Sequence, residues 1–253
     1  MTTTDAIEPQ PAAIAPRKSF VQRVTGVLFS PGETFDDIAR KPDIVAPLLL
    51  LLALTILVTV VMVPRIDFES AFRTQMERSN RDMSPQDMER AAKFGKAIGT
   101  TMAYAGPVLS VIFWAIIAGV LLLAFRLLGG EGTYAQAFSV TLYSWLPLAI
   151  GGIVVAIVIL ARGTLVDPTT IPTLVKSNPA FLVDNRDNPV AFAFLSSLDV
   201  FTIWSVALLS IGFAALSRFS RAKSAAIVVT LWLAVVIVKA GFAALGAAKM
   251  KSS

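Results

Sequence analysis

The stretch Gly129–Gly152, GGEGTYAQAFSVTLYSWLPLAIGG, decides how this chain is arranged. It stands near the middle of the sequence, between two long apolar runs, and its first four residues carry a single charge, Glu131. A short glycine-rich connection of this kind reverses the chain and places the flanking runs side by side as antiparallel helices. We therefore take this stretch as the turn about which the other helices are ordered.

The composition places the other helices in a membrane. Of 253 residues, 55% are hydrophobic and 15% are charged, against roughly 25% charged residues in soluble domains. The uncharged residues are gathered in long runs. At about 1.5 Å per residue, some twenty residues of helix cross a hydrocarbon core of about 30 Å.

Five runs reach this length. They are Ile44–Val63, Ala97–Phe125, a run within Thr133–Ala161, Asp199–Leu216 and about Ala225–Ala248. We predict an all-α membrane protein, a bundle of five transmembrane helices within residues 44–248, with short amphipathic helices before the first and second spans. Residues 1–18 and 249–253 are predicted to be a disordered N-terminal tail and a short C-terminal tail.

Residues 19–43 are predicted to form the first amphipathic segment. One helical face carries Phe20, Val24, Val27 and Leu28, and the polar residues Gln22, Arg23 and Thr25 lie elsewhere. This helix lies either in the membrane interface or on the bundle surface. Ser30-Pro31-Gly32-Glu33 is typical of a helix start with a serine cap, and the second helix should turn Phe35 and Ile38 inward.

The most charged segment, Arg65–Lys96, precedes the second span. Phe68, Phe72 and Met76 share a helical face, which predicts a short amphipathic helix. Ser84-Pro85-Gln86-Asp87 repeats the start signal, and the helix that it begins is expected to continue into the second span.

The sequence contains no cysteine and no histidine. Disulfides, zinc–thiolate sites, iron–sulfur clusters and Ser-His or Cys-His catalytic pairs are therefore excluded. We expect no cofactor, no metal site and no catalytic activity. The net charge of +5 is attributed to loops beside anionic lipid and not to nucleic-acid binding.

Four motifs stand in a fixed order: LFSPGETFDDIARKP before the first span, SPQD before the second, GTYAQAFSVTLYSWLP in the third and SLDVFTIW at the start of the fourth. Over roughly Val27–Leu245 the chain resembles the Ypt-interacting protein (Yip) family in its bacterial branch. The resemblance implies a helical membrane domain with a cytosolic N-terminus, an orientation that counts of Lys and Arg do not choose. It supplies no catalytic residues. The association of eukaryotic relatives with prenylated Rab-type GTPases is not carried over.

Asp199 and Lys239 form a candidate intramembrane ion pair. Each is about twenty residues from the turn between spans four and five, so the two lie at similar depth in an antiparallel pair. The other interpretation is that Asp199 caps span four and Lys239 extends to the headgroups.

Backbone features give a second set of candidates. Gly106-Pro107 and Gly151-Gly152 are equally far from the central turn, so they are predicted to let spans two and three approach closely; simple helix flexibility is the alternative. Bends are expected at Pro107 and Pro147.

The first half of span three is polar, with Thr133, Tyr134, Gln136, Ser139, Thr141, Tyr143 and Ser144. These side chains either line a cavity open to the cytosol or form hydrogen bonds between helices, and the second interpretation is favoured. The small residues Ala240, Ala244 and Ala248 suit helix packing, within one chain or between copies in a homo-oligomer.

The sequence thus predicts a multi-pass protein of the bacterial inner membrane that lacks catalytic activity. It is expected to bind protein partners or to organise membrane, with the N-terminal segment and the charged loop as contact surfaces. The alternative is a carrier or channel for small solutes or ions, although five spans do not divide into two equal halves.

Overall fold

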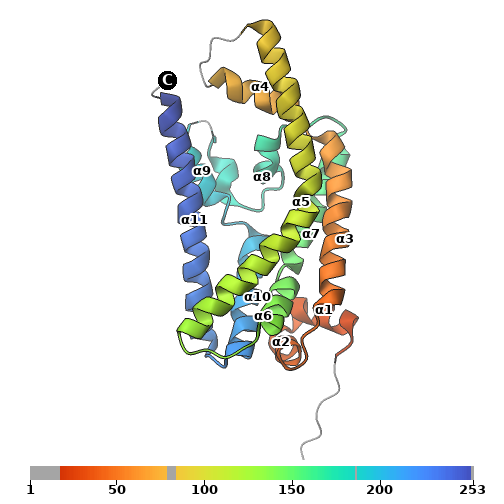
Figure 1. The fold of residues 1–253 in the computed structure, drawn as a ribbon, viewed down its shortest axis with the longest axis vertical. Coiled ribbons are helices and arrows are strands. Elements are labelled where there is room, and N and C mark those ends of the chain that lie inside the picture. The colour runs from red at the N-terminus through yellow and green to blue at the C-terminus, as the bar shows by residue number, and fades with distance from the viewer. Residues whose placement is uncertain (1–17, 79–83, 186, 252–253) are drawn as a thin grey trace, which may run out of the picture.

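The computed structural model describes residues 18–78, 84–185 and 187–251. Five of its helices are long and apolar enough to cross a membrane, namely Val45–Arg65, Pro85–Leu127, Tyr134–Arg162, Val200–Ser217 and Arg221–Ala248 (Figure 1). The predicted fold class is confirmed: the described chain is a helical bundle with five candidate spans.

Two short helices lie across one end of the bundle, which we call the hairpin end (Figure 1). Helix α1 (Phe20–Phe29) begins with a capping box in which Ser19 and Gln22 each bind the backbone of the other. Helix α2 (Pro31–Arg40) starts at the predicted proline, but the Ser30 side chain makes no capping hydrogen bond, so this detail of the prediction was wrong. Residues 1–17, most of the predicted tail, lie outside the described residues.

The first two spans are α3 (Val45–Met62), followed by the 3₁₀ turn η1 (Val63–Arg65), and α5 (Pro85–Leu127). Helix α5 contains both the predicted start at Ser84 and the second span in 43 continuous residues. Pro107 lies inside it, and Figure 1 shows α5 changing direction part way along its length.

The predicted amphipathic helix before the second span is α4 (Phe68–Arg78). It packs on the first part of α5, where the rings of Phe68 and Phe72 cover Gly99 and Gly95. A side chain at either glycine would overlap a ring, so the two glycines allow the helices to approach closely.

The third span is divided into α6 (Tyr134–Ser144) and α7 (Leu146–Arg162), with the break at Trp145. Pro147 stands two residues beyond the break. Its ring excludes the carbonyl of residue 143 from a regular helix, and it has no N–H to continue the hydrogen-bond ladder. The position of the proline thus explains why the span is not one straight helix.

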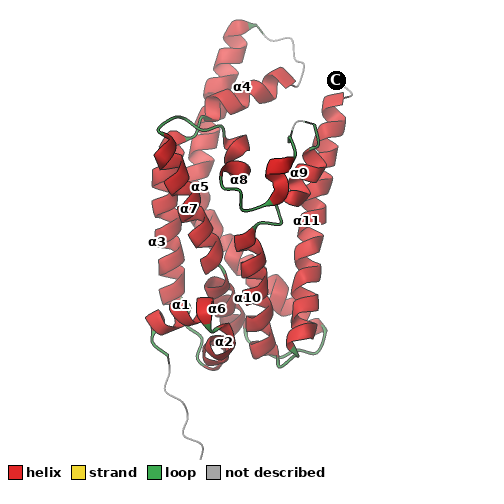
Figure 2. Ribbon diagram, turned by 180° about the vertical axis from the view of Figure 1, so that it is seen from behind, coloured by secondary structure: helices red, strands yellow, loops and turns green. Residues whose placement is uncertain are grey.

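The chain then crosses the opposite end of the bundle, which we call the loop end. This connecting segment contains η2 (Pro168–Thr170), α8 (Ile171–Leu174), η3 (Pro179–Leu182) and α9 (Pro189–Leu195). Helix α10 (Val200–Ser217) returns to the hairpin end, and α11 (Arg221–Lys251) goes back beside α10 and α9 (Figures 1 and 2). Because α11 extends to Lys251, most of the predicted C-terminal tail is helical.

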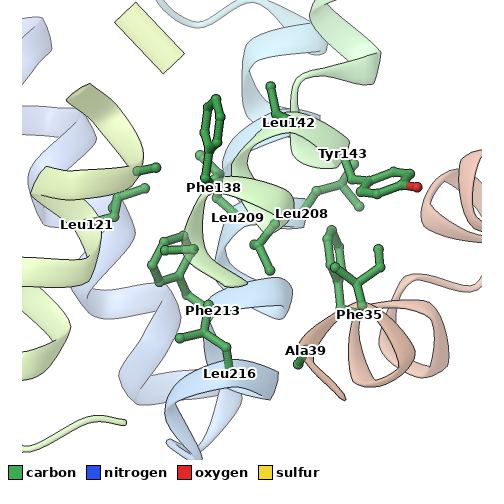
Figure 3. Packing of buried hydrophobic residues seen from close by; sticks show 14 of the residues in the cluster. Phe35, Ala39, Leu121, Phe138, Leu142, Tyr143, Leu208, Leu209, Phe213 and Leu216 are labelled. Atoms are coloured by element: carbon green, nitrogen blue, oxygen red, sulfur yellow. The ribbon is translucent and has the colours of Figure 1, made fainter. Parts of the chain in front are cut away.

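The core is centred on α6, in which every residue from Ala137 to Ser144 is buried. Figure 3 shows Phe35 of α2, Phe138 and Tyr143 of α6, and Phe213 of α10 converging there. Few residues of α3 and α11 are buried inside the bundle by comparison, as expected for spans that face lipid. The core therefore fixes α2 against α6 and α10 at the hairpin end.

Candidate functional site

A buried ion pair joins α1 to α2. The Arg23 side chain is 0% exposed and the Asp37 side chain 7%. Arg23 donates from Nε and Nη2 to Asp37 Oδ2, at 2.9 and 2.8 Å, and Nη2 also donates to the carbonyl of Lys41 at 2.9 Å. The sequence prediction placed Arg23 away from the buried face of α1 and was wrong on this point.

Local sequence explains the position of Arg23. It lies one helical turn before Val27, so both side chains project from the same face, and both are fully buried. Gly26 lies against Thr34 of α2, where a side chain at residue 26 would overlap the threonine. Close contact between the helices leaves the Arg23 guanidinium without access to water, and Asp37 supplies the opposite charge.

The polar half of the third span forms hydrogen bonds that hold α1 and α2, which together we call the hairpin, against the bundle. Gln136 donates from Nε2 to the carbonyl of Ala39 at 2.6 Å. The Ser139 hydroxyl donates to the carbonyl of Asp43 at 2.8 Å and accepts from the Asp43 N–H at 3.1 Å. These contacts agree with the favoured interpretation, in which the polar residues of the span form hydrogen bonds between segments.

A charged cavity of about 510 Å³ opens beside the hairpin. It lies between α2, the central turn, α6 and the end of α10, and its polar lining includes Asp36, Arg40, Glu131, Gln136 and Arg218. Glu131 and Arg218 form an ion pair at 3.2 Å. The cavity thus presents charges of both signs on helices that the core holds in place.

Besides Arg126, which donates to the Gly132 carbonyl, two guanidinium groups at this end lack a carboxylate partner among the described residues. Arg40 is exposed on α2 and makes no ion pair there. Arg221 lies with its Nη2 over Gly32, 2.8 Å from the position that a Cβ at residue 32 would occupy, and it too makes no ion pair in the described chain. Both charges are available to a partner.

The candidate pair Asp199–Lys239 does not form. Asp199 caps α10, accepting from the N–H groups of Phe201 and Thr202, and it also accepts from the Ser177 hydroxyl. Lys239 donates to the hydroxyls of Ser196 and Ser197 at 3.0 and 3.1 Å. The two side chains lie in the same region, as expected, but hydroxyl and backbone groups satisfy each of them separately.

The paired glycines do not bring spans two and three together either. A Cβ at Gly151 would lie 2.8 Å from the ring of Phe201 in α10, and one at Gly152 would lie 3.9 Å from Val58 in α3. At Gly106, no described side chain lies within 4 Å of that position. Gly151 is thus a contact for the fourth span, because the break at Trp145 turns α7 toward α10 and α3.

The comparisons with known proteins agree with this architecture. The chain is 26% identical over 187 residues to the membrane protein YknW of Bacillus subtilis, an alignment that covers 74% of this chain and 75% of the relative. No solved structure matches the chain. The family model described as the Yip1 domain matches residues 25–243, which include α2, the first four spans and most of the fifth, and this chain therefore belongs to the Yip1 domain family.

Proposed function

We propose that this multi-pass membrane protein is a non-catalytic docking protein of the bacterial inner membrane. Its hairpin end faces the cytosol and binds an acidic segment of a partner protein. The observation that carries the proposal is the charged cavity of about 510 Å³, which Arg40 lines, together with Arg221 over Gly32; neither arginine makes an ion pair within the described chain. The cytosolic orientation is the one that the family resemblance implies.

The way in which the hairpin is built supports a docking role. The Arg23–Asp37 pair and the Gln136 hydrogen bond fix α2 before any partner arrives. A preformed surface loses little conformational entropy on binding, which favours affinity. Arginine also presents a planar set of donors that matches carboxylates.

The test is in-cell photo-crosslinking followed by mass spectrometry. A photoreactive residue replaces Asp36 at the cavity, and a matched control replaces Phe94 on α5, which is 65% exposed at the loop end. We expect a discrete protein adduct from position 36 only. Adding Arg40→Gln and Arg221→Gln should reduce its yield, because these changes remove the unpaired positive charges without disturbing the core.

Two results would contradict the proposal. One is the absence of an adduct at position 36; the other is the same adduct at position 94. Ion flux through vesicles that contain the purified protein, together with no adduct, would instead favour a carrier. An adduct that persists in the double arginine variant would refute the acidic-segment specificity while keeping the docking role.

A further inference from the structure

An apolar groove of about 490 Å³ opens between α5, α10 and α11, away from the hairpin cavity. Its walls include Phe113 and Leu121 of α5, Leu209 of α10, and Trp232 and Val235 of α11, and Trp145 also lines it. Except for Thr202 and Ser205, every lining residue is apolar. All three helices are candidate spans, so the medium around this groove is lipid hydrocarbon.

The groove has the length of one acyl chain. Its lining along α11 extends from Val228 to Val238, which at about 1.5 Å per residue is roughly 15 Å. That is about half of a hydrocarbon core of roughly 30 Å, the thickness of a single leaflet. The groove therefore matches one leaflet in depth.

Lys239 stands at the far end of the groove. It follows Val228 by eleven residues, which is close to three full turns, so both project from the same face of α11. It lies sixteen residues beyond Lys223, or about 24 Å along the helix. This places the ammonium near the membrane boundary opposite the hairpin end, where the lysine stem can extend to the headgroups.

The charge of Lys239 has no acidic partner in the described chain. Its two hydrogen bonds go to the neutral hydroxyls of Ser196 and Ser197. Asp199, a few residues further on, is occupied by the cap of α10 and by Ser177. A lysine in an apolar span is costly unless it is paired or reaches water, and an anion beside it would lower that cost.

We propose that the groove binds an anionic phospholipid of the leaflet opposite the hairpin end. One acyl chain lies along α11 between α5 and α10, and the headgroup phosphate pairs with Lys239 and the hydroxyls beside it. The site is independent of the proposed protein-docking role, because the groove lies among α5, α10 and α11, its proposed headgroup contact at Lys239 is far from the hairpin end, and it shares no residue with that surface.

The test uses the full-length protein in nanodiscs of phosphatidylcholine with a minor fraction of phosphatidylglycerol. Native mass spectrometry, after the protein is released from the nanodisc, measures which lipid remains bound to it. We expect retention of phosphatidylglycerol over phosphatidylcholine, reduced about fivefold by Lys239→Gln, because one lysine near the surface contributes about 1 kcal/mol to binding anionic lipid. Lys93→Gln, which removes an exposed charge of α5 outside the groove, should change nothing.

A second pair of variants tests the groove itself. Val235→Trp fills it and should abolish retention of both lipids, whereas Ile237→Trp adds the same ring on α11 at an exposed position that does not line the groove, and should have no effect. Equal retention of both lipids by the native protein would overturn the proposal. So would a lipid-free dimer, which would mean that a second copy covers the groove.

A measurement on the native sequence removes the dependence on variants. Trp145 and Trp232 line the groove, so a lipid with brominated acyl chains quenches their fluorescence when it occupies the groove. Brominated phosphatidylglycerol should quench at a lower mole fraction than brominated phosphatidylcholine. Identical quenching curves would refute selectivity for the anionic headgroup.

Discussion

The buried ion pair between Arg23 and Asp37 predicts a large and asymmetric response to mutation. Arg23→Met keeps much of the apolar stem but leaves Asp37, 7% exposed, as a buried carboxylate without its counter-ion. Breaking such a pair from one side costs about 3–5 kcal/mol. The variant also loses the hydrogen bond from Arg23 to the carbonyl of Lys41.

This loss acts first on the contact between α1 and α2. At about 1.4 kcal/mol for each factor of ten, this cost of about 3–5 kcal/mol should raise the population with α1 separated from α2 by about two to three and a half orders of magnitude. Hydrogen exchange of the α1 amides measures that population, because the amides exchange when the helix opens. The double variant Arg23→Met with Asp37→Leu should recover most of the protection, since neither charge is then buried alone.

A matched control comes from an exposed pair. Lys93→Met breaks the Lys93–Glu89 contact on α5, where the two side chains are 67% and 55% exposed, and should leave exchange of α1 unchanged. The reasoning fails if Arg23→Met exchanges as slowly as the native protein. It also fails if the double variant exchanges as fast as the single one, because apolar packing alone would then hold the hairpin.

Three further predictions concern packing, hydrogen bonding and pH. Gly151→Ala places a Cβ 2.8 Å from a ring carbon of Phe201 and should lower the Tm in detergent, since overpacking costs about 1–3 kcal/mol. Gly106→Ala meets no described side chain within 4 Å and should raise the Tm in the same scan, because Ala favours a helix by about 1 kcal/mol over Gly. Gln136→Leu leaves the carbonyl of Ala39 on α2 without its 2.6 Å hydrogen bond. An unpaired buried carbonyl costs about 1–3 kcal/mol, so hydrogen exchange of the α2 amides should become faster. The Ser70 backbone N–H donates to Asp67 and lowers the pKa of that carboxyl from its ordinary value of 3.8. The ionised Asp67 therefore stabilises the start of α4 fully above pH 3.8, and this stabilisation is lost as the pH falls through the folded pKa. An NMR titration of the α4 amides should follow that loss, and a titration of Asp67→Asn that keeps the same acid transition would exclude Asp67 as its cause.

The candidate site was predictable in part. The helix start at Pro31 and the inward positions of Phe35 and Ile38 follow from a proline at the first helical position and from periodicity, and the structure buries both side chains fully. Arg23 was missed because a charged residue in a short amphipathic helix is normally assigned to the solvated face. The available signal was its spacing of four residues from Val27, together with an aspartate in the next helix. A pairing between two helices is a tertiary event, and periodicity within one helix cannot reveal it.

The sequence by itself determined the number of spans and the main breaks. A run without charges must be a membrane helix, because hydrocarbon offers no partner for an unpaired peptide group, and Pro147 interrupts the hydrogen-bond ladder wherever α7 is placed. Only the tertiary structure decided which polar group meets which. Asp199 caps α10 and Lys239 binds two serines, whereas Arg23 and Asp37 form the buried pair. Equal distance from a turn sets depth along the bundle but leaves rotation about each helix axis free. The packing of α6 against α2 and α10 fixes that rotation.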